Sequence, residues 1–190
     1  MAAVSEYATV MVELSLTPVE ASQKAGELAA WLQSAGVIRP ILDQDHLRLP
    51  SEFQAGPNVL SVAPGFDNVA RWLLNNGVDI LVGRDWYHPY ENYEPPDCPA
   101  CGHTLDGDAH HELLEPWLFG PEPRVACSAC GGGALLGDWI AHGDDEWGRW
   151  TFYIAELAVQ FNNWPALTAS FRDELGRRMG ARWRVVNQHR

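Results

Sequence analysis

The chain has 190 residues, of which 46% are hydrophobic, and its formal net charge at pH 7 is −12. This length and this apolar fraction suffice for a folded domain with a buried core, and they exclude a disordered chain. No apolar run approaches the roughly 20 residues of a membrane-spanning helix, and residues 1–16 lack the basic region of a secretory signal. We therefore expect a soluble, cytoplasmic protein.

The first part of the chain predicts a strand followed by a helix. Residues 7–16 (YATVMVELSL) are rich in β-branched side chains and alternate with a period near two, which predicts a strand. Thr17 is a favourable N-cap, Pro18 suits the first helical position, and Glu20 completes a capping box. Apolar residues then recur at helical spacing until Gly36, where we expect the helix to end.

Further elements follow along the chain, each bounded by glycine, asparagine or proline. We expect a second helix at 66–75, a short buried strand at 78–83 and a loop at 85–97, followed by the cysteine-containing region at 98–130. After it we expect a hairpin of two strands, 134–142 and 150–161, then a third helix at 163–180 and a last strand at 181–186.

Strands and helices on both sides of the cysteines predict an α+β fold with α/β-like layers. We expect one mixed sheet, about three helices and an inserted four-cysteine zinc ribbon. The predicted division of the chain is residues 1–95 for the N-terminal half of the core, 96–135 for the insertion and 136–190 for the C-terminal part of the core.

All four cysteines lie in two C-x-x-C-G motifs, CPACG at 98–102 and CSACG at 127–131. A tight turn over C-x-x-C brings two thiolates to one side, where both can reach a tetrahedral Zn²⁺ at about 2.3 Å. The glycine after each pair permits a positive φ and lets backbone N–H groups approach the sulfurs. The predicted metal ligands are Cys98, Cys101, Cys127 and Cys130.

Four thiolates leave no open coordination position, so we expect one zinc ion with a structural role. The alternative is a thiol redox role in which zinc is released as a switch. The residues beside the cysteines are not cationic, and therefore do not favour a reactive thiolate.

The two motifs resemble the zinc ribbon family over about residues 96–135. The segment NNWPALTASFRDELGRRMGARWRVV, together with these motifs, is similar to an uncharacterised group of bacterial proteins. Some members of that group carry the label of a sugar ABC transporter ATPase. This chain has no G-x-x-x-x-G-K-[ST] motif, so the resemblance implies no ATPase activity here.

The segment HHELLE at 110–115 approaches a hydrolytic motif. Metalloproteases use H-E-x-x-H, but Glu115 occupies the position of the second histidine. In the hydrolase alternative, His110, His111 and nearby carboxylates would hold a second metal ion, and His111 and Glu115 would share a helix face beside Asp106 or Asp108. The other interpretation of this segment is a solvated acidic face or loop. We predict no catalytic residue and no organic cofactor, since motifs for a nucleophile elbow, a dinucleotide and a P-loop are absent from the sequence.

Charge is unevenly distributed. Residues 85–146 contain thirteen acidic residues and one basic residue, Arg124. We therefore expect this acidic, aromatic segment to repel nucleic acid. We expect it to bind another protein, possibly a basic one, in an immunity-like or adaptor role. The remaining alternative is nucleic-acid binding through the C-terminal arginines. These are Arg172, Arg177, Arg178, Arg182, Arg184 and Arg190.

Overall fold

The computed structural model describes residues 7–41, 51–66, 75–90, 92–144 and 148–189. Within these ranges the predicted α+β class is confirmed, with a mixed eight-stranded sheet and a separate two-stranded sheet. The strand order of the large sheet is β2-β3-β4-β9-β1-β10-β8-β7, and β10 and β8 are parallel neighbours. The helix predicted at 66–75 falls almost entirely outside the described residues.

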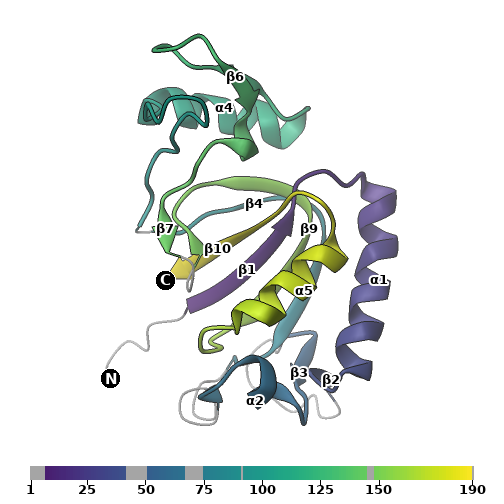
Figure 1. Ribbon diagram of the computed structural model, residues 1–190. Coiled ribbons are helices and arrows are strands. Elements are labelled where there is room, and N and C mark those ends of the chain that lie inside the picture. The colour runs from purple at the N-terminus through teal and green to yellow at the C-terminus, as the bar shows by residue number, and fades with distance from the viewer. Residues whose placement is uncertain (1–6, 42–50, 67–74, 91, 145–147, 190) are drawn as a thin grey trace, which may run out of the picture.

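The helices and strands follow one another along the chain in the order used below (Figure 1). They are β1 (Tyr7–Glu13), α1 (Pro18–Ser34), β2 (Ile38–Pro40), β3 (Phe53–Ala55), α2 (Val59–Val62), β4 (Val78–Tyr87), α4 (Gly107–Phe119), β5 (Arg124–Ala126), β6 (Gly133–Leu135), the 3-10 helix η2 (Leu136–Asp138), β7 (Gly143–Asp144), β8 (Gly148–Arg149), β9 (Tyr153–Asn162), α5 (Ala169–Met179) and β10 (Trp183–His189).

The start of α1 forms as the sequence predicts. The Thr17 side chain accepts a hydrogen bond from the Glu20 backbone N–H, and the Glu20 carboxylate accepts one from the Thr17 N–H at 2.8 Å. Gly36 follows the helix with a φ of 69°, a conformation that glycine adopts without a steric penalty. Both ends of α1 are therefore specified by residues close in sequence.

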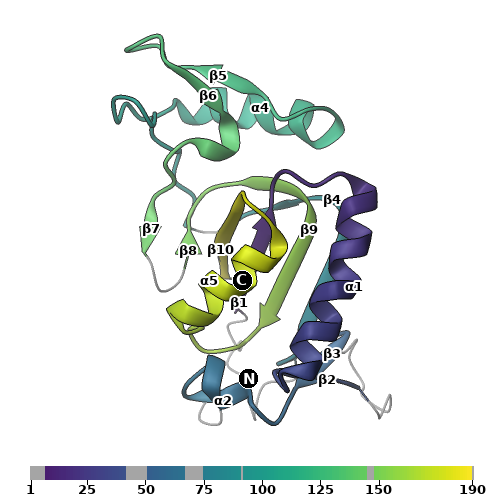
Figure 2. The ribbon, with the colours of Figure 1, turned by 45° about the vertical axis from the view of Figure 1, so that its right-hand side comes forward.

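Two apolar cores lie on opposite faces of the large sheet, because successive side chains of a strand point to opposite sides. On β1, Met11 belongs to the core that packs against α1, α2 and α5, whereas Val10 and Val12 belong to the core that packs against α4 and η2. Figure 2 shows α4, β5 and β6 at one end of the strongly curved sheet, with α2, β2 and β3 at the other. The cysteine segment (residues 96–135) thus supplies part of the cover of the second face.

Several predicted elements differ from the structure. Residues 134–142 do not form a strand of a hairpin with 150–161, since this range contains the end of β6 and then η2. The strand predicted at 150–161 does form, as β9, but it lies in the middle of the sheet between β1 and β4. The helix expected from 163 begins later, at Ala169, with Thr168 as its N-cap.

The strand expected to be short and buried at 78–83 is instead the ten-residue β4, whose middle is exposed. It pairs with β9 along most of its length, whereas its pairing with β3 within the described ranges is confined to Phe53 and Val78, so most of β4 has no second neighbouring strand there. The apolar run in the sequence predicted burial, but the short β3 leaves Leu81 and Val82 uncovered.

An arginine of β4 ties α4 to the sheet. The guanidinium of Arg84 donates to the Trp117 carbonyl at 2.7 Å and to the Gly120 carbonyl, at the C-terminal end of α4. It also pairs at 3.1 Å with the buried carboxylate of Glu156 on β9. A cation at this end of a helix satisfies free carbonyl groups and interacts favourably with the helix dipole.

A second charged cluster joins β10 to the residues on either side of β5 and β6. Arg182 donates two hydrogen bonds to the Glu122 carboxylate, at 2.7 and 3.0 Å, and pairs with Asp138 at 2.9 Å. Arg184 pairs with the same Asp138 at 2.9 Å. These two arginines therefore bind the chain's own carboxylates.

Replacing Arg182 with alanine should lower the free energy of unfolding by about 1–3 kcal/mol, because it leaves the half-buried Glu122 without its two-point partner. Denaturant unfolding measures the change. The matched control is Arg177→Ala on α5, whose side chain is 68% exposed and pairs with Glu174 at the surface. We expect the control to shift stability by less than about 0.5 kcal/mol; equal losses in the two variants would contradict the role assigned to Arg182.

Candidate metal centre

The four cysteines come together at one place, although a helix lies between the two motifs. All four sulfur atoms lie within 4.8 Å of one another. The Cys98 and Cys130 sulfurs are 3.9 Å apart, and those of Cys101 and Cys127 are 3.7 Å apart. Four sulfurs at about 2.3 Å from a central Zn²⁺ would be separated by about 3.8 Å along the edges of a tetrahedron. The cluster thus has the donor type, number and spacing of a metal site.

The two C-x-x-C-G turns have the same backbone structure. In the first turn, the Cys98 N–H donates to the His103 carbonyl at 2.9 Å, and the Gly102 N–H donates to the Cys98 carbonyl at 2.8 Å. In the second turn the same bonds link Cys127 to residues 131 and 132, at 2.9 and 2.8 Å.

The glycine predicted to need a positive φ has one in both turns, with φ values of 71° for Gly102 and 72° for Gly131. A backbone N–H donates to a cysteine sulfur at 3.4 Å in each, from Ala100 to Cys98 and from Gly132 to Cys130. These bonds partly compensate the negative charge of the thiolates.

The chain after the second turn holds the two turns against each other. Asp97 and Ile140 exchange two backbone hydrogen bonds of 2.8 Å, so the residue before Cys98 is fixed to the segment that follows η2. In this segment Trp139 packs against Cys98 and Cys127, the two buried sulfurs. The metal site is consequently supported by residues outside its own motifs.

The thiols of Cys127 and Cys101 have pKa values shifted in opposite directions. Backbone N–H groups, that of Cys130 most strongly, lower the pKa of the Cys127 thiol to about 6. The His103 backbone N–H lowers the pKa of Cys101, but hydrogen bonds with the neighbouring thiols and desolvation outweigh it and raise this pKa to about 12. Four thiolates at these distances repel one another, and a divalent cation removes that repulsion.

His103, which follows the first turn directly, is exposed and lies outside the cysteine cluster. Its Nε2 lies 3.3 Å from the Ser128 hydroxyl, which links the first turn to the second. Elsewhere, His142 pairs with the carboxylate of Asp97 at 3.2 Å, and His88 stacks on Phe152 with ring centroids 5.3 Å apart. Within the described ranges, the four cysteines are the one group of three or more His, Cys, Asp or Glu side chains close enough to hold a metal ion.

The residues of the hydrolase alternative do not form a site. His110 is fully buried in α4, and its Nδ1 lies 2.8 Å from the hydroxyl of Tyr93. Burial, and then the charge of His111, lower the pKa of His110 to about 4, so the ring is neutral near pH 7. His111 and Glu115 are exposed, as the sequence suggests for a solvated face.

The buried His110 should make stability depend on pH. Its pKa falls from 6.5 to about 4 on folding, so the unfolded chain takes up the proton first as the pH falls. The contribution of His110 to the free energy of unfolding is therefore fully present above pH 6.5, and up to about 3 kcal/mol of it is lost as the pH falls from 6.5 to about 4. His110→Phe should remove this part of the loss, whereas His111→Phe should retain it; denaturant unfolding between pH 7 and pH 5 compares the variants. The same pH dependence in all three proteins would contradict the assignment.

Sequence reasoning missed the two charged clusters that hold the cysteine segment. One signal was available: Glu156 interrupts the apolar run of β9, and a charge in such a position is normally paired. Its partner Arg84 lies 72 residues away along the chain, a separation over which the sequence carries no pairing signal.

No protein-family profile, no curated protein and no solved structure matches this chain. No helix within the described residues is long and apolar enough to cross a membrane.

Proposed function

We propose that this chain is a zinc-stabilised binding protein that recognises another protein through the outer surface of α4. One observation carries the proposal. Asp108, Glu112 and Glu115 recur at intervals of four and three residues on the exposed side of α4, and none pairs with a cation among the residues described. Phe119, which is 81% exposed, continues the same face by one turn. We call these four residues the α4 face.

The α4 face has the chemistry of a recognition surface for a basic protein. Uncompensated carboxylates attract a partner of opposite charge and raise the rate of encounter. An exposed aromatic side chain beside them offers the apolar contact that interfaces commonly bury. Such a surface suits the immunity-like or adaptor role expected from the acidic middle of the chain.

The metal ion in this proposal is Zn²⁺, bound by Cys98, Cys101, Cys127 and Cys130. Four thiolate ligands fill the tetrahedral sites of zinc, so the ion would stabilise the fold and leave no position for a substrate. The resemblance to zinc ribbons, and to the bacterial group that shares the two motifs, remains part of this proposal. We also propose that the chain is divided at residues 96 and 135. The proposed location is cytoplasmic, which agrees with cysteines kept as thiolates.

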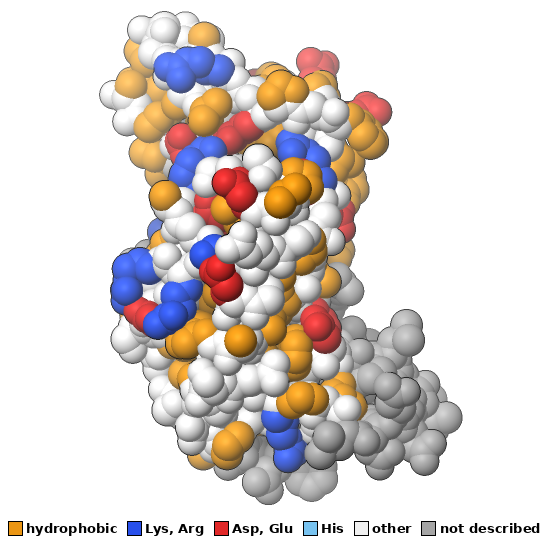
Figure 3. All heavy atoms as spheres, turned by 90° about the vertical axis from the view of Figure 1, so that its right-hand side faces the viewer, with side chains coloured by type: hydrophobic (Ala, Val, Ile, Leu, Met, Phe, Trp, Pro, Cys, Tyr) orange, Lys and Arg blue, Asp and Glu red, His pale blue; other side chains and the backbone are white. Residues whose placement is uncertain are grey.

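The nucleic-acid alternative is less favoured, because four of the six arginines that it needs, Arg177, Arg178, Arg182 and Arg184, pair with carboxylates of the chain. Arg190 lies outside the described residues. Arg182 and Arg184 bind Glu122 and Asp138, and the Arg178 guanidinium lies 4.4 Å from the centre of the Trp31 ring. On the side of the molecule seen in Figure 3, Lys and Arg side chains lie beside Asp and Glu side chains at several places instead of gathering in one basic patch.

The test is affinity capture from the source cells at low salt, with quantitative mass spectrometry. The variant Glu112→Gln/Glu115→Gln neutralises two charges of the α4 face, and Glu27→Gln/Asp173→Asn neutralises two exposed acids elsewhere. We expect a basic protein that the wild type and the second variant capture, that the first variant loses, and that high salt releases. If no captured protein distinguishes the two variants, the proposed function is wrong.

A further inference from the structure

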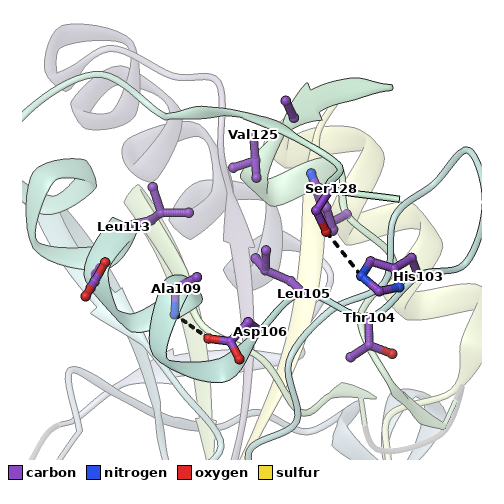
Figure 4. A pocket seen from close by; sticks show the side chains of 11 residues that line it. His103, Thr104, Leu105, Asp106, Ala109, Leu113, Val125 and Ser128 are labelled. Carbon is purple, nitrogen blue, oxygen red and sulfur yellow. Dashed lines mark hydrogen bonds between the residues drawn. The ribbon is translucent and has the colours of Figure 1, made fainter. Parts of the chain in front are cut away.

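A pocket of about 700 Å³ opens between the two cysteine turns and α4. Figure 4 shows side chains from α4, from the first turn and from β5 pointing toward it, with Leu105, Leu113 and Val125 among them. Its volume lies within the range of about 300–1,000 Å³ that is typical of ligand sites. The apolar lining indicates a ligand with an apolar group.

Carboxylates stand at the α4 side of this pocket. Asp106 and Glu112 both line it, and no lysine or arginine does. One oxygen of Asp106 caps α4 by accepting from the Ala109 N–H at 3.0 Å, whereas Glu112 has no ion pair with any described residue. This lining repels phosphates and other anions and favours a cationic ligand.

The pocket also includes a buried polar group without a partner. The indole of Trp139 lines it and is 3% exposed, and its Nε1 makes no hydrogen bond within the part of the chain described. A buried donor left unsatisfied costs free energy, so an acceptor supplied by a ligand would be favoured here. Backbone carbonyl groups of a peptide are acceptors of this kind.

We infer that this pocket binds a short peptide segment of a partner protein, which inserts an apolar side chain and places an adjacent arginine or lysine against Glu112 and Asp106. The inference deepens the proposed function and rests on it, since Glu112 belongs both to the pocket and to the α4 face. The pocket would give the recognition its sequence preference, while the α4 face attracts basic proteins in general.

The probe is a seven-residue peptide, acetylated and amidated, with one leucine between two arginines in a glycine–serine frame. Binding to the zinc-loaded full-length protein is followed by NMR, through the indole N–H resonance of Trp139, which Trp139→Phe identifies. We expect saturable binding with a shift of this resonance. The two matched peptides, with glutamates for the arginines or glycine for the leucine, should bind at least about tenfold more weakly.

Variants of the protein locate the site. Glu112→Gln should weaken binding by about threefold, the scale of one exposed ion pair, and clearly more than Glu115→Gln, which removes a charge of the α4 face outside the pocket. Ala109→Leu fills part of the pocket and should weaken binding by about tenfold or more, whereas Ala30→Leu, exposed on α1, should not.

The results separate this inference from the proposed function. Equal effects of the two glutamate substitutions, or no effect of Ala109→Leu, would mean general attraction to the α4 face and would overturn the pocket assignment. Capture of a basic partner through the α4 face without any peptide binding would overturn the inference and leave the proposed function standing. If the arginine peptide binds but the capture experiment fails, the pocket assignment stands and the proposed function is wrong.

Discussion

Replacing Cys98 and Cys127 with serine should abolish stoichiometric zinc binding and destabilise the whole protein. Each substitution removes one buried ligand from one of the two turns, so neither pair can hold the ion alone. Structural zinc contributes on the order of 10 kcal/mol to the folding of small sites, which is comparable to the total stability of a domain. We expect one zinc per chain in the wild type and none in the variant by elemental analysis.

The loss should extend beyond the cysteine segment, because Leu114 and Trp117 of α4 pack against Val10 and Val12 of the central strand β1. Releasing the segment would expose this second core to water. Circular dichroism and thermal unfolding measure the effect, with Ala129→Ser as a control that changes an exposed residue between two ligands. A variant that keeps its metal and its unfolding temperature would show that the cysteines are not the ligands. A second metal that survives the substitutions would revive the hydrolase alternative at His110 and His111.

Trp117→Ala should lower the free energy of unfolding by about 3–5 kcal/mol, the usual cost of removing a buried tryptophan. Trp117 is 1% exposed and is the largest side chain that α4 contributes to the second core. Its truncation leaves a cavity beneath the helix and weakens the attachment of the cysteine segment to the sheet. Denaturant unfolding of the zinc-loaded protein measures the change.

Phe119→Ala is the matched control, because it removes an aromatic ring from the same helix two residues later, at a position that is 81% exposed. We expect it to alter stability by less than about 0.5 kcal/mol. If Trp117→Ala behaved like this control, the cysteine segment would be an appendage that the sheet does not need. A large loss from Trp117→Ala would instead establish that the segment and the core fold as one cooperative unit.

The structure gives the cysteine segment two kinds of attachment to the sheet. One is apolar, through Trp117 and Leu114, and the other is polar. Arg84 donates hydrogen bonds to carbonyl groups at the C-terminal end of α4, and Arg182 forms an ion pair with Glu122 just after it. Without these arginines, the helix carbonyls and the Glu122 carboxylate would face the sheet without partners. Together they orient α4 so that its carboxylates point away from the sheet.

The sequence by itself determined the features that a few neighbouring residues encode. The capping box of Thr17 and Glu20 formed as predicted, and so did the two turns with positive φ at Gly102 and Gly131. The strand predicted at residues 7–16 forms over residues 7–13, because a period of two over several residues distinguishes a strand from a helix. In each case the physical cause lies within one turn or one strand.

Only the tertiary structure decided how these pieces are used. It placed β9 in the middle of the sheet, left the middle of β4 exposed, and paired Arg182 with Glu122 across 60 residues of sequence. It also buried His110, which the hydrolase alternative would use to hold a second metal ion, and it formed the pocket beside the cysteine turns from three separate segments. Burial and long-range pairing depend on which elements meet in space, and residue order does not carry that information.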